Sequence, residues 1–242
     1  KNNVKTISIV NVLNSSIARL SDLILPTLAG PEIGVASTKA FTSQLTALCV
    51  LLLNFQKLNK SKISNNYIDL FNTSVSIKKI LLQDIKIKSI VKNLINKKSI
   101  FYIGRGLMYP IALEGALKLK EITYKHCEGY AAGELKHGPL ALIEDNIPVI
   151  ALAPFDENFQ KISSNIQEIK ARGGIIITLT DKLGLKKIKK YSDYTILLPE
   201  AKSYSLPIIY SIPIQLIAYH LAVFLGTDVD QPRNLAKSVT VE

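Results

Sequence analysis

The stretch from Glu114 to His137 (EGALKLKEITYKHCEGYAAGELKH) concentrates acidic and basic side chains. At about 100° per residue, Glu114, Lys118 and Glu121 fall within one stripe, roughly 60° wide, of a predicted helix. Apolar residues flank the stripe on both sides, so this helix is expected to be largely buried. Either the three charges pair with one another or they line a polar cavity, and the sequence leaves both arrangements open. Buried carboxylates and lysines have environment-sensitive pKa values, which suits general acid–base chemistry.

His137 lies in a short glycine-rich segment, GELKHGP. Gly133, Gly138 and Pro139 around it predict a tight turn, an unusual place for a surface histidine. Taken alone, a single histidine is still more often structural than catalytic. No second His or Cys stands at metal-ligand spacing, so no metal site is predicted. His220, in a long apolar stretch, is expected to be a hydrogen-bonded core histidine.

The C-terminal segment DVDQPRNLAKSVTVE carries Arg233 and Lys237 four residues apart. A lysine near a cation can be held deprotonated enough to attack a carbonyl carbon. A frayed tail is the plain alternative, and the residues alone favour it.

Gly104-Arg105-Gly106 follows a strand-like run, which invites a dinucleotide-binding interpretation. Tyr109 occupies the third glycine position, and no acid follows a second strand at the right distance. We therefore predict no nicotinamide or flavin cofactor. A glycine turn at the carboxyl end of a strand still suits some other ligand.

The composition argues against nucleic acid and membrane partners. The net charge is +11, but the lysines are scattered, there is no Trp, and aromatic residues do not interleave with the basic clusters. A phosphorylated metabolite is a more economical anionic ligand. The apolar run Leu45–Phe55 is too short to cross a bilayer and contains Asn54, so we expect a buried helix there. Cys49 and Cys127 lack a partner motif and fit a reducing, cytoplasmic compartment.

Alternating strand and helix signals predict an α/β fold with a doubly wound parallel sheet. The predicted strands share unalternated apolar sequences and cover residues 6–12, 22–27, 100–104, 147–153, 175–180 and 194–198. The predicted helices begin at Ser37 or Thr38, with Pro110 at the first helical position, and at residues 156 and 207, the last ending at Gly226. The glycine-bracketed stretch before His137 is expected to be a loop.

This pattern divides the chain into four parts. We expect residues 1–60 to be part of a first α/β unit that has too few strands for a complete sheet. Residues 61–90 are predicted to be a helical connection, 91–232 a complete second α/β domain and 233–242 a C-terminal tail. Lys1 is not preceded by a Met, which suggests a fragment.

Four segments resemble the isomerase part of the glutamine–fructose-6-phosphate aminotransferases, the family of glucosamine-6-phosphate synthases. They are GPEIGVASTKAFTSQL (30–45), GRGLMYPIALEGALKLKEITY (104–124), GYAAGELKHGPLALI (129–143) and GTDVDQPRNLAKSVTVE (226–242). With the order of elements between them, the match spans essentially all 242 residues. The resemblance implies flavodoxin-like sugar-isomerase (SIS) domains, one partial and one complete.

The resemblance also implies catalytic roles, position by position. Lys237 matches the lysine that forms a Schiff base with the ketose, which makes 233–242 a catalytic tail. Glu121 matches the base that moves a proton between C1 and C2, and Lys118 assists it. His137 matches the histidine that opens the sugar ring, which in the family reaches the site from the neighbouring subunit and so implies a homodimer. An iminium at C2 acidifies the C1 protons, so the set is chemically coherent.

Substrate contacts carried over from the family fall at Val35, Ser37 and Ala236, and Glu114 and Arg233 complete the predicted substrate-binding set. The implied substrate and product are fructose 6-phosphate and glucosamine 6-phosphate, with ammonia taken from glutamine. This reaction is the first step of hexosamine and UDP-N-acetylglucosamine synthesis.

Two family features have no counterpart in these residues: the glutaminase domain with its N-terminal cysteine, and the Ser/Thr-rich phosphate loop of the first SIS domain. We therefore expect the chain alone to be inactive or nearly so. Two alternatives are a non-catalytic SIS module that binds sugar phosphates as a regulator, and a related SIS deaminase. The ending PRNLAKSVTVE favours the synthase.

Overall fold

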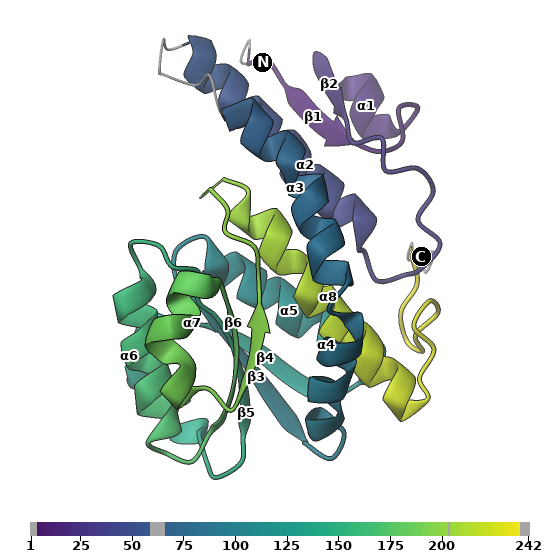
Figure 1. Ribbon diagram of the computed structural model, residues 1–242. Coiled ribbons are helices and arrows are strands. Elements are labelled where there is room, and N and C mark those ends of the chain that lie inside the picture. The colour runs from purple at the N-terminus through teal and green to yellow at the C-terminus, as the bar shows by residue number, and fades with distance from the viewer. Residues whose placement is uncertain (1–3, 59–65, 203, 238–242) are drawn as a thin grey trace.

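The computed structural model describes residues 4–58, 66–202 and 204–237. Within them the chain forms two parallel sheets with helices around them (Figure 1). The elements in chain order are β1 (Ile7–Val10), α1 (Ser16–Leu20), β2 (Leu23–Pro26), α2 (Lys39–Leu58), α3 (Asn66–Leu81), α4 (Asp84–Val91), η1 (Lys92–Leu94), β3 (Ser99–Gly104), α5 (Met108–Thr123), β4 (His126–Ala131), η2 (Ala132–His137), η3 (Pro139–Leu142), β5 (Pro148–Leu152), α6 (Phe159–Lys170), β6 (Ile175–Thr180), α7 (Lys182–Ile188), η4 (Lys189–Tyr191), β7 (Tyr194–Leu197) and α8 (Leu206–Leu225).

The larger sheet has the order β4-β3-β5-β6-β7 in the described residues, and all its strand pairs are parallel. Taken along the chain this is the 2-1-3-4-5 order of flavodoxin-like folds. Alternate residues of each strand face two separate cores: Tyr102 and Ile150 join α4, α5 and α8, whereas Phe101 and Val149 join α6. The predicted doubly wound sheet, covered on both faces, is confirmed.

The smaller sheet pairs β1 with β2 in parallel, with Ile7 opposite Leu23. Helix α2 lies beside it, and α3 runs from there toward the larger sheet (Figure 1). The prediction that the apolar stretch of α2 is a buried helix is wrong for one side: Leu53 is fully buried, but Leu52 and Phe55 are about half exposed. A sheet of two strands is too narrow to cover more than one face of this helix.

The predicted loop in the glycine-bracketed stretch before His137 is wrong: Gly129–Ala131 belong to strand β4, and Ala132 begins η2. The strand's sequence, HCEGYA, lacks an apolar run because β4 lies at the edge of the sheet, where β3 is its one partner among the described strands. Gly129 brings it close to α5: a Cβ atom there would lie 2.8 Å from the Leu113 backbone. A glycine that looks like a turn signal in the sequence therefore marks a close contact between helix and strand.

Helix α5 begins at Met108, two residues before the predicted first position at Pro110. It ends at Thr123, and the C-cap residue Tyr124 has a φ of 58°, in the left-handed region. Gly115 allows the helix to pack directly on the sheet, because a Cβ atom there would lie 2.6 Å from the Tyr102 ring.

Replacing Gly115 with alanine is therefore expected to destabilise the chain. Alanine in mid-helix stabilises by about 1 kcal/mol relative to glycine, but overpacking a buried ring costs about 1–3 kcal/mol and should outweigh that gain. Urea unfolding followed by circular dichroism measures the change, with Ser164→Ala on the exposed side of α6 as the control. A Gly115→Ala variant as stable as the wild type would contradict this packing.

Among the described residues, one helix, α8, is long and apolar enough to cross a membrane by length and composition alone. Its most apolar stretch has a mean hydropathy of 1.8. In the fold, 61% of that stretch is buried. His220 on α8 is bonded through Nε2 to Asp84 Oδ1 at 2.6 Å, which confirms the predicted hydrogen-bonded core histidine. The apolar surface of α8 thus serves mainly as the contact for α5, α4 and α3.

Candidate active site

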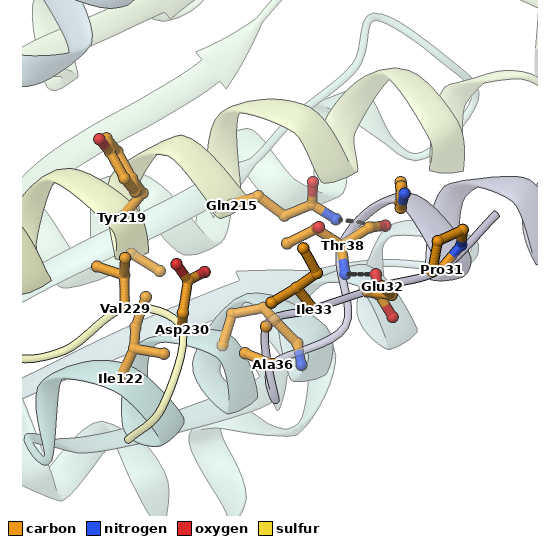
Figure 2. A pocket seen from close by; sticks show the side chains of 14 residues that line it. Pro31, Glu32, Ile33, Ala36, Thr38, Ile122, Gln215, Tyr219, Val229 and Asp230 are labelled. Carbon is orange, nitrogen blue, oxygen red and sulfur yellow. Dashed lines mark hydrogen bonds between the residues drawn. The ribbon is translucent and has the colours of Figure 1, made fainter. Parts of the chain in front are cut away.

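A cavity of about 500 Å³ lies where four parts of the chain meet. One wall is the loop from Pro31 to Thr38, which precedes α2. The other walls come from α5, from α8 and from the segment after α8, which supplies Val229 and Asp230 (Figure 2). The cavity therefore joins residues far apart in the sequence.

The loop is held in place by the C-terminal segment and by α8. Val35 N donates to Asp230 O at 2.8 Å, and Gln215 Nε2 donates to Thr38 O at 3.4 Å. Gly34 fits closely against this segment, because a Cβ atom there would lie 3.2 Å from Asp230 Oδ1. These contacts fix the loop from Pro31 to Thr38, which forms one wall of the cavity.

The stripe on α5 pairs internally, which is the first of the two arrangements left open by the sequence, and only its Lys118 also lines the cavity. Lys118 Nζ donates to Glu121 Oε2 at 2.5 Å and lies 3.7 Å from Glu114 Oε1. The Lys118 side chain is only 5% exposed and forms part of the cavity wall. A buried cation and the carboxylate of Glu121 thus stand together at one side of the cavity.

Glu114 has an altered acidity. Burial raises its pKa from 4.5 to about 7, with a further contribution from the charge of Glu121, while Lys118 opposes the shift. Its Oε1 atom has no hydrogen-bond partner among the described residues. Glu114 borders a neighbouring apolar groove with Leu113 and Leu117 and does not line the main cavity. With this pKa the Glu114 carboxyl is partly protonated near neutral pH, beside Lys118.

Lys237 joins the C-terminal segment to the opposite wall. Its Nζ donates to Glu32 Oε2 at 2.9 Å, to Gly34 O at 2.9 Å and to Val35 O at 3.5 Å. The hypothesis of a neighbouring cation is wrong for this arrangement, because the charged group beside Lys237 is an acid. Both Glu32 and Gly34 line the cavity, so the Lys237 amine is bonded to two residues of its wall.

Glu32 was not predicted from the sequence as a site residue. Its Oε1 accepts from the backbone N–H groups of Thr38 and Ala40, at 2.8 and 3.2 Å. Burial pushes the pKa of Glu32 upward, but these N–H groups and the Lys237 ammonium outweigh burial and hold the pKa at about 2. The sequence offers one weak indication of this role: Glu32 is an acid that precedes a predicted helix. It lies too far from the start of that helix to occupy one of the usual N-capping positions.

His137 does not reach this cavity within the chain. It lies at the end of η2, its side chain is 73% exposed, and its Nδ1 is 2.8 Å from Glu134 Oε2. The predicted tight turn is present, since Gly138 has a φ of 143°.

The remaining predicted contacts differ in their positions. Val35 and Ser37 belong to the loop, and both are half-buried. Ala236 is exposed and precedes Lys237. Arg233 lies outside the cavity lining: its guanidinium stacks on the Tyr124 ring at 4.2 Å, and its backbone N donates to Tyr124 Oη at 2.7 Å. Arg233 thus fixes the C-terminal segment to the end of α5.

Two classes of chemistry find little support in the described residues. No group of three or more His, Cys, Asp or Glu side chains is gathered there in a way that could hold a metal ion. Cys49 and Cys127 are buried and unpaired, and burial raises both thiol pKa values, that of Cys127 to about 12. Neither thiol is therefore suited to act as a nucleophile.

The chain thus has a flavodoxin-like α/β fold in which α5 and the C-terminal segment that bears Lys237 meet beside one cavity. The SIS domain family matches residues 1–54 and 93–225, so the chain belongs to the SIS-domain family.

Two similar curated proteins carry the same name. The chain is 55% identical to the glutamine–fructose-6-phosphate aminotransferase [isomerizing] of Bartonella henselae and 50% identical to that of Bradyrhizobium diazoefficiens. Each match covers 99% of this chain but 40% of the relative, so the chain spans less than half the length of these proteins.

The C-terminal domain of glucosamine-fructose-6-phosphate aminotransferase from Francisella tularensis has a similar structure. It superposes with a TM-score of 0.91 at 46% identity, over 95% of this chain and 65% of that one. A glucosamine-6-phosphate deaminase from Thermotoga maritima, 22% identical with a TM-score of 0.73, shows the shared fold alone. The resemblance found from sequence motifs is confirmed.

Proposed function

We propose that this chain is the isomerase part of a glutamine–fructose-6-phosphate aminotransferase [isomerizing]. It would convert fructose 6-phosphate and ammonia into glucosamine 6-phosphate and water. The observation that carries the proposal is that residues lining one cavity hold both reactive groups: Lys118 binds Glu121, and Glu32 with Gly34 binds the Lys237 amine. The names of the relatives in the preceding comparisons support it.

Each side chain has one role in this proposal. The Lys237 amine forms a carbon–nitrogen bond to C2 of the open-chain ketose, and the carbonyl oxygen leaves as water. Ammonia then replaces the lysine at C2. Glu121 takes a proton from C1 and returns one to C2, so that the carbonyl group forms at C1. The ammonium of Lys118, bonded to Glu121, holds the carboxylate in position.

Sugar contacts are proposed for the loop and the C-terminal segment. Val35 and Ala236 would contact the sugar through their backbone and Ser37 through its hydroxyl. Glu114 would act as a proton reserve beside Lys118, and Arg233 would hold the segment that carries Lys237. The division into a partial SIS domain (1–60), a helical connection (61–90), a second SIS domain (91–232) and a catalytic tail (233–242) belongs to this proposal.

His137 is proposed to serve the cavity of a second copy of the chain and to open the sugar ring there. Its exposed position and its absence from the cavity lining of its own chain agree with this role. The proposed protein is a cytoplasmic homodimer in which a glutaminase domain supplies ammonia. Its product would enter hexosamine and UDP-N-acetylglucosamine synthesis.

Borohydride reduction in the presence of fructose 6-phosphate tests the proposal. The complete gene product should gain one sugar phosphate on the peptide that contains Lys237, because reduction converts the Schiff base into a stable amine. Mass spectrometry locates the adduct. Lys237→Arg should lose it, whereas Lys57→Arg, at the far end of α2, should retain it.

Absence of any adduct at Lys237 in the complete gene product would overturn the enzymatic assignment and favour a sugar-binding regulator. If the adduct forms and the complete gene product takes nitrogen from free ammonia but not from glutamine, the related deaminase is favoured instead.

A further inference from the structure

We propose that Glu32 is the positioning residue for Lys237: its fixed carboxylate binds the lysine ammonium and aims the amine at the ligand carbonyl in the cavity. This inference rests on the proposed function for the identity of the ligand. The contact between Glu32 and Lys237 is itself a feature of the structure.

The Glu32 carboxylate is bonded to the backbone where α2 begins. Its Oε1 accepts both the Thr38 and the Ala40 backbone N–H groups at the start of α2. Its side chain is only 9% exposed. One oxygen is therefore used to fix the carboxylate, and Oε2 remains free to bind Lys237.

Lys237 uses all its hydrogen-bond donors at this wall. An ammonium has three N–H groups, and Nζ has three acceptors: Glu32 Oε2, Gly34 O and Val35 O. The arrangement thus binds the charged form of the lysine. The Lys237 side chain is still 46% exposed, so the amine can leave its acceptors without disturbing the core.

Glu32 acts as an anchor and not as the base that removes the lysine proton. With its pKa at about 2, its carboxylate is too weak a base for that task. No separate base is needed for the net step. An ammonium and a ketone give a protonated iminium and water: the nitrogen gives up one proton before it attacks, and the carbonyl oxygen takes up protons as it leaves, so the net charge is the same before and after the step. The carboxylate of Glu32 faces a cation before and after the bond forms.

Other charged groups border the cavity but do not contact this amine. Asp230 lies on the segment packed against the loop, Lys39 lies at the start of α2, and Lys118 lies on α5. None of these three is bonded to Lys237 Nζ among the described residues. Glu32 is therefore the group to replace in a test.

Glu32→Gln separates charge from fold. The amide oxygen still accepts from Thr38 and Ala40, so the start of α2 keeps its contacts, but the amide N–H groups then face an ammonium that accepts no hydrogen bond. Without any sugar, acetic anhydride should modify Lys237 about fivefold faster in Glu32→Gln than in the wild type, because the amine is released from its acceptor. Asp22→Asn, which removes the exposed partner of Lys5, should leave the rate at Lys237 unchanged.

With fructose 6-phosphate and borohydride, the adduct at Lys237 should form about tenfold to a hundredfold more slowly in Glu32→Gln, because the amine is no longer aimed. The two rates thus move in opposite directions. Urea unfolding of Glu32→Gln should match the wild type, which excludes a collapsed loop as the cause.

Equal acetylation rates in Glu32→Gln and the wild type would overturn the inference, as would an adduct rate unchanged by the substitution. If the wild type forms no sugar adduct while acetylation changes as expected, the proposed function fails and the contact between Glu32 and Lys237 still positions the amine.

Discussion

Glu121→Gln is expected to lower the amination turnover of the complete gene product by about 10²–10⁴-fold, the usual contribution of a positioned general base. The amide has nearly the shape of the carboxylate, so it keeps a contact with Lys118, but it cannot take a proton from C1. The KM for fructose 6-phosphate should change little, because Glu121 acts on the C1 proton in the transition state and not on the bound substrate. Formation of glucosamine 6-phosphate, measured by a coupled assay, gives both constants.

The same variant should still form the borohydride-trapped adduct at Lys237, since that step precedes proton transfer. Glu144→Gln, an exposed carboxylate beyond η3, provides the matched control and should keep full turnover. Retention of more than one tenth of the wild-type turnover by Glu121→Gln would exclude Glu121 as the base. Urea unfolding of the variant guards against a loss of fold.

Lys118→Met is expected to destabilise the chain by about 3 kcal/mol at pH 8. Removal of one partner from a buried ion pair leaves an uncompensated charge, and this commonly costs about 3–5 kcal/mol. Here the partial exposure of Glu121, 21%, places the expected loss at the lower end of that range. Urea unfolding measures the loss, and Lys120→Met, an exposed lysine on the same helix, is the control.

The loss should be smaller at pH 5, and Glu114 gives the reason. Its folded-state pKa of about 7 exceeds its ordinary value of 4.5, so between these values the folded chain binds more protons than the unfolded chain. Stability therefore falls as the pH rises through this window, and the charged form of Glu114 is present mainly above it. Lys118→Met removes the cation that offsets this charge, so its cost grows with pH.

A double variant makes this explanation specific. Adding Glu114→Gln to Lys118→Met should restore about 1 kcal/mol at pH 8 and almost nothing at pH 5. A loss in Lys118→Met that is the same at both pH values would show that Glu114 does not titrate in this window.

The boundary errors and the missed strand have local causes. The central strands were predicted closely because a strand covered on both faces must be apolar throughout, as in β6 (Ile175–Thr180). Strand β4 has a single neighbour and contains Gly129, so its sequence resembles a turn. Such a glycine can form a turn or can allow a helix to pack closely against a strand. Gly129 does the second because α5 lies against it, and a local sequence pattern does not reveal that contact.

The sequence by itself determined the parallel α/β fold, the charged stripe on α5 and the family. These depend on periodicity within one element or on runs of matching residues, so neighbours along the chain are sufficient to reveal them. It also singled out Lys237, but only through the resemblance.

Only the tertiary structure decided which charges meet. Glu32 and Lys237 are 205 positions apart, and their contact exists because the loop docks on the segment after α8. The same docking forms the cavity and brings Lys118 to its wall, whereas η2 leaves His137 exposed elsewhere. Ion pairs between distant segments depend on packing geometry, and packing geometry is not encoded in the spacing of residues along any one element.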